Sequence, residues 1–111
     1  MNVVDSCGWL EYIANGPNAS LFEPALADLP NLIVPSITIY EVCKRVLVQS
    51  AQTFANRAVN AMCRGQVVHL DAENLRLAAL ASVRYKLTMA DAIIWQTARL
   101  HQHNYLRKTR I

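Results

Sequence analysis

The chain has 111 residues, a length that suits one domain and excludes large barrels and full dinucleotide-binding folds, which need more strands. Hydrophobic residues make up 53% of the chain and charged residues 17%, so the chain is apolar enough to bury a core, and overall disorder is excluded. The formal net charge of +3 is too small to indicate a nucleic-acid partner by itself.

The charges are distributed unevenly along the chain. Residues 1–43 contain five acidic and no basic residues, whereas residues 44–111 contain all 11 basic residues and three acidic ones. No apolar run is long enough to cross a bilayer, and the first residues lack the positive charge of a secretory signal. The expected location is therefore the cytoplasm. The three cysteines, Cys7, Cys43 and Cys63, are expected to be reduced there, and to be buried as small apolar side chains.

The first third of the chain predicts one strand and two helices. Residues 2–5 contain the apolar, β-branched pair Val3-Val4, which is typical of a short buried strand. Ser6 is expected to cap a helix that stops before Asn15-Gly16-Pro17. Residues 18–29 also have apolar residues at helical spacing. Pro24 opposes a helix there, because proline is unfavourable beyond the first turn of a helix.

The rest of the chain repeats the alternation of strands and helices. Because strands separated by helices pair in parallel through right-handed crossovers, the predicted fold is a three-layer α/β domain with a small parallel sheet. Phe54 and Val83 are expected to face its core, and Tyr105 lies in an expected edge strand. The predicted elements are a strand over 32–35, a helix capped by Ser36 and running through about Gln49, a helix over about 51–64, a strand over 66–70, a helix capped by Asp71 and a helix capped by Thr88.

Three acidic residues lie at or just past the ends of predicted strands or at helix starts, where reactive groups gather in such folds. Asp5 ends the first strand, and its alternative role is to cap the next helix. Glu41 lies on a largely apolar helix, where a buried acid needs a partner or a metal, and its alternative is an exposed edge position. Asp91 fits a T-x-x-D pattern with Thr88, so its alternative role is to tie down the start of the last helix.

Taken together, the three acids favour a metal site. Carboxylates that converge in one pocket repel one another unless a cation neutralises them, and hard oxygen ligands suit Mg²⁺ or Mn²⁺. Such a cation can activate a water molecule for attack on a phosphodiester. The basic residues of 44–111 could then hold the backbone of a nucleic acid.

Three segments match known motifs in order and spacing: Val-Val-Asp-Ser-Cys-Gly-Trp-Leu-Glu at 3–11, Ile-Val-Pro-Ser-Ile-Thr-Ile-Tyr-Glu-Val at 33–42 and Leu-Thr-Met-Ala-Asp-Ala-Ile-Ile at 87–94. With them the sequence resembles a PIN-domain ribonuclease, specifically a VapC-type toxin of a bacterial toxin–antitoxin pair. The resemblance covers roughly residues 1–103.

The resemblance implies a metal-dependent endoribonuclease toxin that hydrolyses RNA phosphodiesters. Asp5, Glu41 and Asp91 would be the catalytic residues that bind Mg²⁺ or Mn²⁺, and Ser6 and Thr88 would orient their carboxylates. Family members homodimerise and are held inactive by a small VapB-type antitoxin. The expected partners are therefore RNA, such an antitoxin and a second copy of the chain, with no membrane.

The end of the sequence departs from the family pattern. These proteins continue into one more strand and a loop that carries a fourth acidic residue, whereas residues 101–111 contain no acid. The expectation is a single PIN-like domain over residues 1–111 that lacks this strand and this acid, with impaired cleavage. The alternative is a catalytically inactive protein of the same fold that binds antitoxin or RNA.

Overall fold

The computed structural model describes residues 2–101 and 104–106, so part of the predicted domain, at both ends and at 102–103, lies outside the described residues. Helices and short strands alternate through the described chain, as the sequence predicted. In order they are β1 (Asn2–Val4), α1 (Ser6–Ile13), α2 (Ala19–Ala27), the 3₁₀ turn η1 (Leu29–Asn31), β2 (Leu32–Pro35), α3 (Ser36–Gln49), α4 (Gln52–Met62), β3 (Gln66–Val68), α5 (Ala72–Tyr85), α6 (Met89–His101) and β4 (Asn104–Leu106).

The strands form one parallel sheet in the order β3-β2-β1-β4. β1 lies between β2 and β4, with Val3 opposite Ile33 on one side and Tyr105 on the other. The predicted parallel sheet is therefore confirmed, and β4 confirms the edge strand expected around Tyr105. The lack of a further strand and of a fourth acid stays a prediction.

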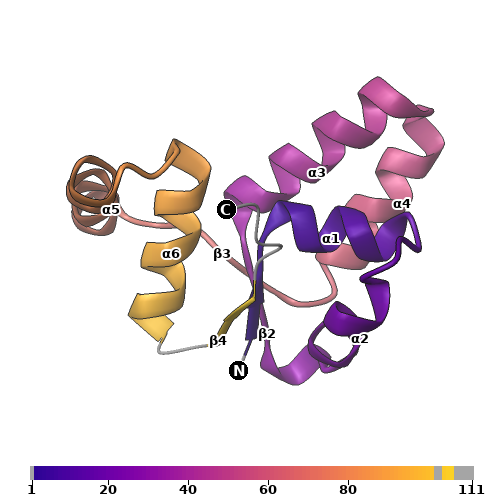
Figure 1. The fold of residues 1–111 in the computed structure, drawn as a ribbon, viewed down its shortest axis with the longest axis horizontal. Helices are drawn as coiled ribbons and strands as arrows, with labels where there is room; N and C mark the ends of the chain where they lie inside the picture. Colours follow the sequence, from indigo (N-terminus) through magenta and orange to yellow (C-terminus); the bar gives the residue numbers. More distant parts are fainter. Residues whose placement is uncertain (1, 102–103, 107–111) are drawn as a thin grey trace.

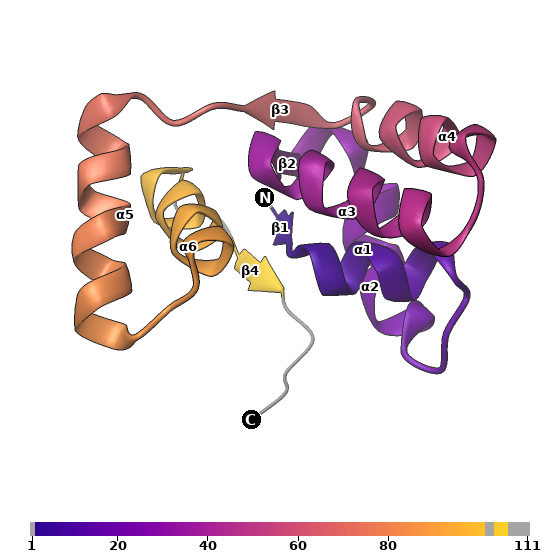
Figure 2. The same cartoon turned by 90° about the horizontal axis from the view of Figure 1, so that it is seen from above.

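Helices cover both faces of the sheet (Figures 1 and 2). Successive residues of a strand point to opposite faces, and the strands divide accordingly. Val4 belongs to a core cluster with Phe22 and other residues of α1 to α4, whereas Val3 and Ile33 pack against α6. This arrangement confirms the three-layer α/β/α fold.

Two helix caps differ from the sequence predictions, and a third is confirmed. Asp5, not Ser6, is the N-cap of α1, because its side chain accepts the Gly8 N–H three residues on; Ser6 is the first helical residue. Ser36 is likewise the first residue of α3, which begins after Pro35 without a side-chain cap. The predicted cap of α5 is confirmed, since Asp71 accepts the Asn74 N–H at 2.9 Å.

The hydrogen bond from the Asn74 backbone, helped by the Asn74 side chain, lowers the pKa of the Asp71 carboxyl. A carboxyl whose pKa is lower in the folded state stabilises the fold above its unfolded-state pKa. The contribution of this cap is therefore lost as the pH falls through the lowered value.

Two residues predicted to face the core are exposed. Phe54 is 53% exposed because the buried side of α4 is formed by Ala55, Ala58 and Met62 instead. Val83 is 83% exposed because α5 packs against α6 through small residues. The prediction of a buried cysteine is also wrong for Cys63, which is exposed. Within the described residues, no helix combines the length and hydropathy that crossing a membrane requires.

Candidate active site

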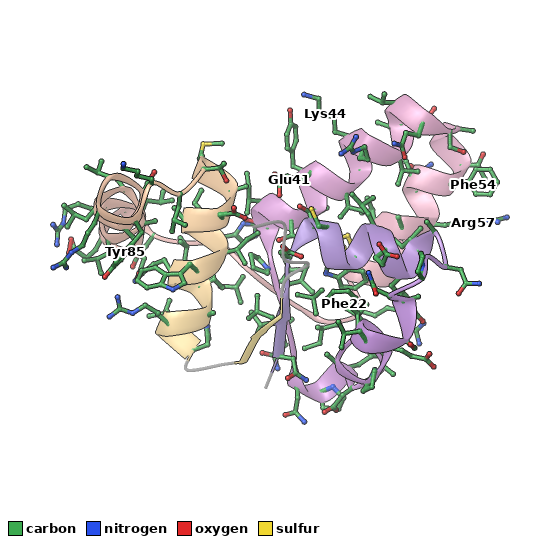
Figure 3. The ribbon with its side chains drawn as sticks, viewed as in Figure 1. Phe22, Glu41, Lys44, Phe54, Arg57 and Tyr85 are labelled. Atoms are coloured by element: carbon green, nitrogen blue, oxygen red, sulfur yellow. The ribbon has the colours of Figure 1, made fainter. Side chains whose placement is uncertain are left out.

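The topology brings the three predicted acids to one edge of the sheet. β1 and β2 are parallel, so their carboxyl ends share an edge; Asp5 directly follows β1, and Glu41 lies in the second turn of α3, which directly follows β2. α6 starts at this edge and runs back toward the other before β4, which places Asp91 in the first turn of α6 (Figure 1). Figure 3 shows Glu41 above the carboxyl end of the sheet.

Asp5 is held in place by the start of α1. Its side chain is only 3% exposed, and Oδ1 accepts the Gly8 N–H at 2.8 Å. α1 also packs closely against the core at Gly8. A Cβ atom added at this residue would lie only 2.6 Å from Val4 Cγ1 and 2.9 Å from Phe22 Cε1. The helix cap predicted as the alternative role of Asp5 is thus present, and it fixes the carboxylate at the edge of the sheet.

The other two acids are half-buried on helices. Glu41 lies on α3, and its Oε1 is shielded from solvent. In the first turn of α6, the Asp91 backbone N–H donates to Thr88 Oγ1 at 3.2 Å, which confirms the predicted cap. Since this bond uses the backbone of Asp91, it places the residue without using its carboxylate. Ser6 is half-buried and Thr88 is exposed.

The donor set consists of carboxylates, the ligands that Mg²⁺ and Mn²⁺ prefer. Among residues 2–101 and 104–106, however, no three His, Cys, Asp or Glu side chains lie close enough together to hold one ion. Mg²⁺ is commonly bound by one or two carboxylates together with water and phosphate oxygens. The chemistry of the donors therefore fits the cation, while a shared site for all three acids stays a prediction.

Sequence reasoning did not single out Thr38, one turn before Glu41. Its hydroxyl is buried and has no hydrogen-bond partner within the part of the chain that the structure describes. The only signal in the sequence was a hydroxyl residue three positions before the acid, on a helix with apolar neighbours.

A cavity of about 690 Å³ lies elsewhere, between α1, α3 and the start of α4. None of the three candidate acids lines it. Its wall includes Cys7, Arg45 and Glu11, and Glu11 is itself buried, with Oε2 accepting the Asn18 N–H at 3.1 Å. Glu11 thus anchors the loop between α1 and α2, and we assign it no part in the candidate site.

The family model for the PIN domain matches residues 3–107. The chain belongs to the PIN-domain family. The match spans all three acids, and the resemblance seen in the sequence is confirmed at this level. The comparison with curated proteins found no match.

Solved structures share the fold of this PIN domain at low sequence identity. A toxin–antitoxin complex from Klebsiella pneumoniae is 20% identical, with a TM-score of 0.77 over 95% of this chain and 83% of that chain. Mycobacterium tuberculosis VapC20, described as a sarcin–ricin loop cleaving toxin, is 15% identical. Its TM-score is 0.83, and the match covers 98% of this chain and 90% of that chain. PAE2754 from Pyrobaculum aerophilum is 16% identical, with a TM-score of 0.75, and the match covers 98% of this chain and 80% of that chain.

Proposed function

We propose that this PIN domain is a VapC-type toxin, a metal-dependent endoribonuclease that hydrolyses RNA phosphodiesters. The observation that carries the proposal is the placement of Asp5, Glu41 and Asp91 at the carboxyl edge of the sheet in a chain of the PIN family. Two proteins of the same fold are described as a toxin–antitoxin complex and as a sarcin–ricin loop cleaving toxin, which supports the same class of activity here.

The three acids would hold Mg²⁺ or Mn²⁺, with Ser6 and Thr88 orienting their carboxylates. When bound, such a cation polarises the phosphodiester and lowers the pKa of a water. The chain contributes the fixed positions of the donors. Asp5 is held by the Gly8 N–H, and Asp91 is placed by the cap at Thr88.

The surface of α3 next to Glu41 suits an RNA strand. Lys44 lies one turn beyond Glu41, and both are labelled in Figure 3. The Lys44 ammonium is 5.8 Å from the centre of the exposed Tyr40 ring. A cation beside an exposed aromatic ring offers one contact for a phosphate and one for an unstacked base, the pair of contacts that single-stranded RNA uses.

The proposed inhibitor is a VapB-type antitoxin, and the proposed place of action is the cytoplasm. The solved Klebsiella relative is described as a toxin–antitoxin complex, which supports a partner of this kind. The second candidate function is a PIN-fold protein without catalysis that binds antitoxin or RNA. Within the part of the chain that the structure describes, no three His, Cys, Asp or Glu side chains are grouped closely enough to hold one ion, and this favours the alternative.

Cleavage of RNA in the presence and absence of metal tests the proposal. Antitoxin-free protein with Mg²⁺ or Mn²⁺ is expected to cut RNA into discrete fragments, and EDTA is expected to abolish the cutting because the carboxylates then hold no cation. Intact RNA at high protein concentration, with metal present, would contradict the proposal. Binding of RNA without cutting, weakening steeply with added salt, would instead support the second candidate.

We also propose that the chain forms a homodimer through the outer face of α5. This helix packs on α6 but exposes a row of large apolar residues, among which Leu80 is 56% exposed. Its start carries Asp71 and Glu73, and its end carries Arg84 and the C-cap Lys86. Two copies of α5 packed antiparallel would therefore bury the apolar row and place opposite charges at each end.

Light scattering after size exclusion tests this interface. The wild-type mass is expected to be twice 12.4 kDa, and Leu80→Glu is expected to reduce it to 12.4 kDa by placing a charge in the apolar contact. Leu21→Glu serves as the matched control, because Leu21 is similarly exposed on α2. A wild-type monomer at all concentrations, or a Leu80→Glu dimer, would argue against this face.

A further inference from the structure

Thr38 is fully buried, and its hydroxyl has no hydrogen-bond partner among the described residues. A buried hydroxyl without a partner costs free energy, whereas valine has nearly the same shape and no polar atom to satisfy. Stability alone therefore favours valine at this position. The threonine needs an explanation other than packing.

A second buried threonine shows what is missing at Thr38. Thr97 is also fully buried, but its Oγ1 donates to the Ile93 carbonyl at 2.8 Å, the residue one turn earlier in α6. Thr38 lies in the first turn of α3, and the residue four positions before it, Val34, belongs to β2. No preceding helical turn is present at Thr38 to offer such a carbonyl, so the hydroxyl is left for another acceptor.

Glu41, three residues after Thr38 on α3, is the acceptor that we consider, because it also belongs to the candidate active site. Residues three apart on an α-helix are neighbours, with about 5–6 Å between their Cβ atoms. The Glu41 Oε1 is shielded from solvent, as is the Thr38 hydroxyl. A hydroxyl that can donate and a carboxylate oxygen are thus set on adjacent turns at the edge of the proposed metal site.

We propose that Thr38 is a positioning residue, whose hydroxyl donates a hydrogen bond to the Glu41 carboxylate when that carboxylate holds the cation. The proposal rests on the metal-dependent activity proposed above. Carboxylates that bind metals are themselves held by hydrogen bonds, and loss of such a partner weakens metal binding by about 10–100-fold. The hydroxyl would thus be satisfied in the metal-bound state at a cost to the metal-free fold.

The test compares Thr38→Val, Thr38→Ser and the control Thr97→Val by calorimetric titration with Mn²⁺ and by thermal unfolding in EDTA and in Mn²⁺. We expect Thr38→Val to unfold at the wild-type temperature or higher in EDTA, yet to bind Mn²⁺ about 10–100-fold more weakly and gain less from the metal. Thr38→Ser keeps the hydroxyl and is expected to keep the affinity. Thr97→Val is expected to leave the affinity unchanged.

The outcomes separate this proposal from the proposed function. If wild type binds Mn²⁺ and Thr38→Val binds it equally well, the role of Thr38 is overturned while the metal site stands. If Thr38→Ser loses as much affinity as Thr38→Val, the hydroxyl is not the cause and the role is again overturned. If wild type neither binds Mn²⁺ nor cleaves RNA, both proposals are overturned together.

Discussion

Asp5→Asn is expected to slow RNA cleavage by about 10²-fold or more, because charge stabilisation by a bound cation contributes several kcal/mol and this carboxylate would hold it. The substitution suits the purpose because asparagine is as good an N-cap as aspartate and can still accept the Gly8 N–H. Rates of fragment formation at saturating Mn²⁺, measured beside thermal unfolding in EDTA, give the result.

The control for this substitution is the cap of α5. Asp71→Asn makes the same chemical change at an N-cap that accepts the Asn74 N–H, and Asp71 is exposed and belongs to a different helix. It is expected to leave the cleavage rate at the wild-type value. If wild type and Asp5→Asn cleave RNA at equal rates, Asp5 is not a catalytic residue and serves only as the N-cap of α1.

Phe22→Ala is expected to lower the free energy of unfolding by about 3–5 kcal/mol, the cost of deleting a large buried aromatic side chain. Phe22 is 1% exposed and lies in the core cluster that contains Val4, against which α1 is packed (Figure 3). Urea unfolding, followed by circular dichroism, measures the change.

A neighbouring leucine provides the control for Phe22. Leu21 lies on the same helix but is 67% exposed, so Leu21→Ala is expected to change the unfolding free energy by no more than about 0.5 kcal/mol. A loss of less than about 1 kcal/mol for Phe22→Ala would show that this cluster does not stabilise the placement of α1 and Asp5.

The fold could be predicted from the sequence because its signals are local. β-branched runs such as Val3-Val4, and caps such as Asp71 and Thr88, depend on residues only a few positions apart. The prediction was wrong where a helix had more apolar residues than its neighbours could cover. Periodicity placed Val83 inward, but within the described residues α5 packs mainly against α6, and its buried face is made of small residues.

The candidate site could be predicted only in part. The order of strands places Asp5 and Glu41 at one edge, and this follows from parallel pairing. The distances between carboxylates depend on side-chain rotamers and on the charges they face, which no local pattern contains. The missing partner of Thr38 could not be foreseen either, because it depends on how α3 begins against β2 in three dimensions.

The proposed function requires that acids from separate parts of the chain serve one cation. Anomalous scattering recorded at the manganese edge, from a crystal of the protein soaked in Mn²⁺, tests this requirement. We expect an anomalous peak at the carboxyl edge of the sheet, in contact with Asp5 and with Glu41 or Asp91. A fully occupied ion bound only elsewhere, or no ion at this edge at high Mn²⁺ concentration, would contradict it.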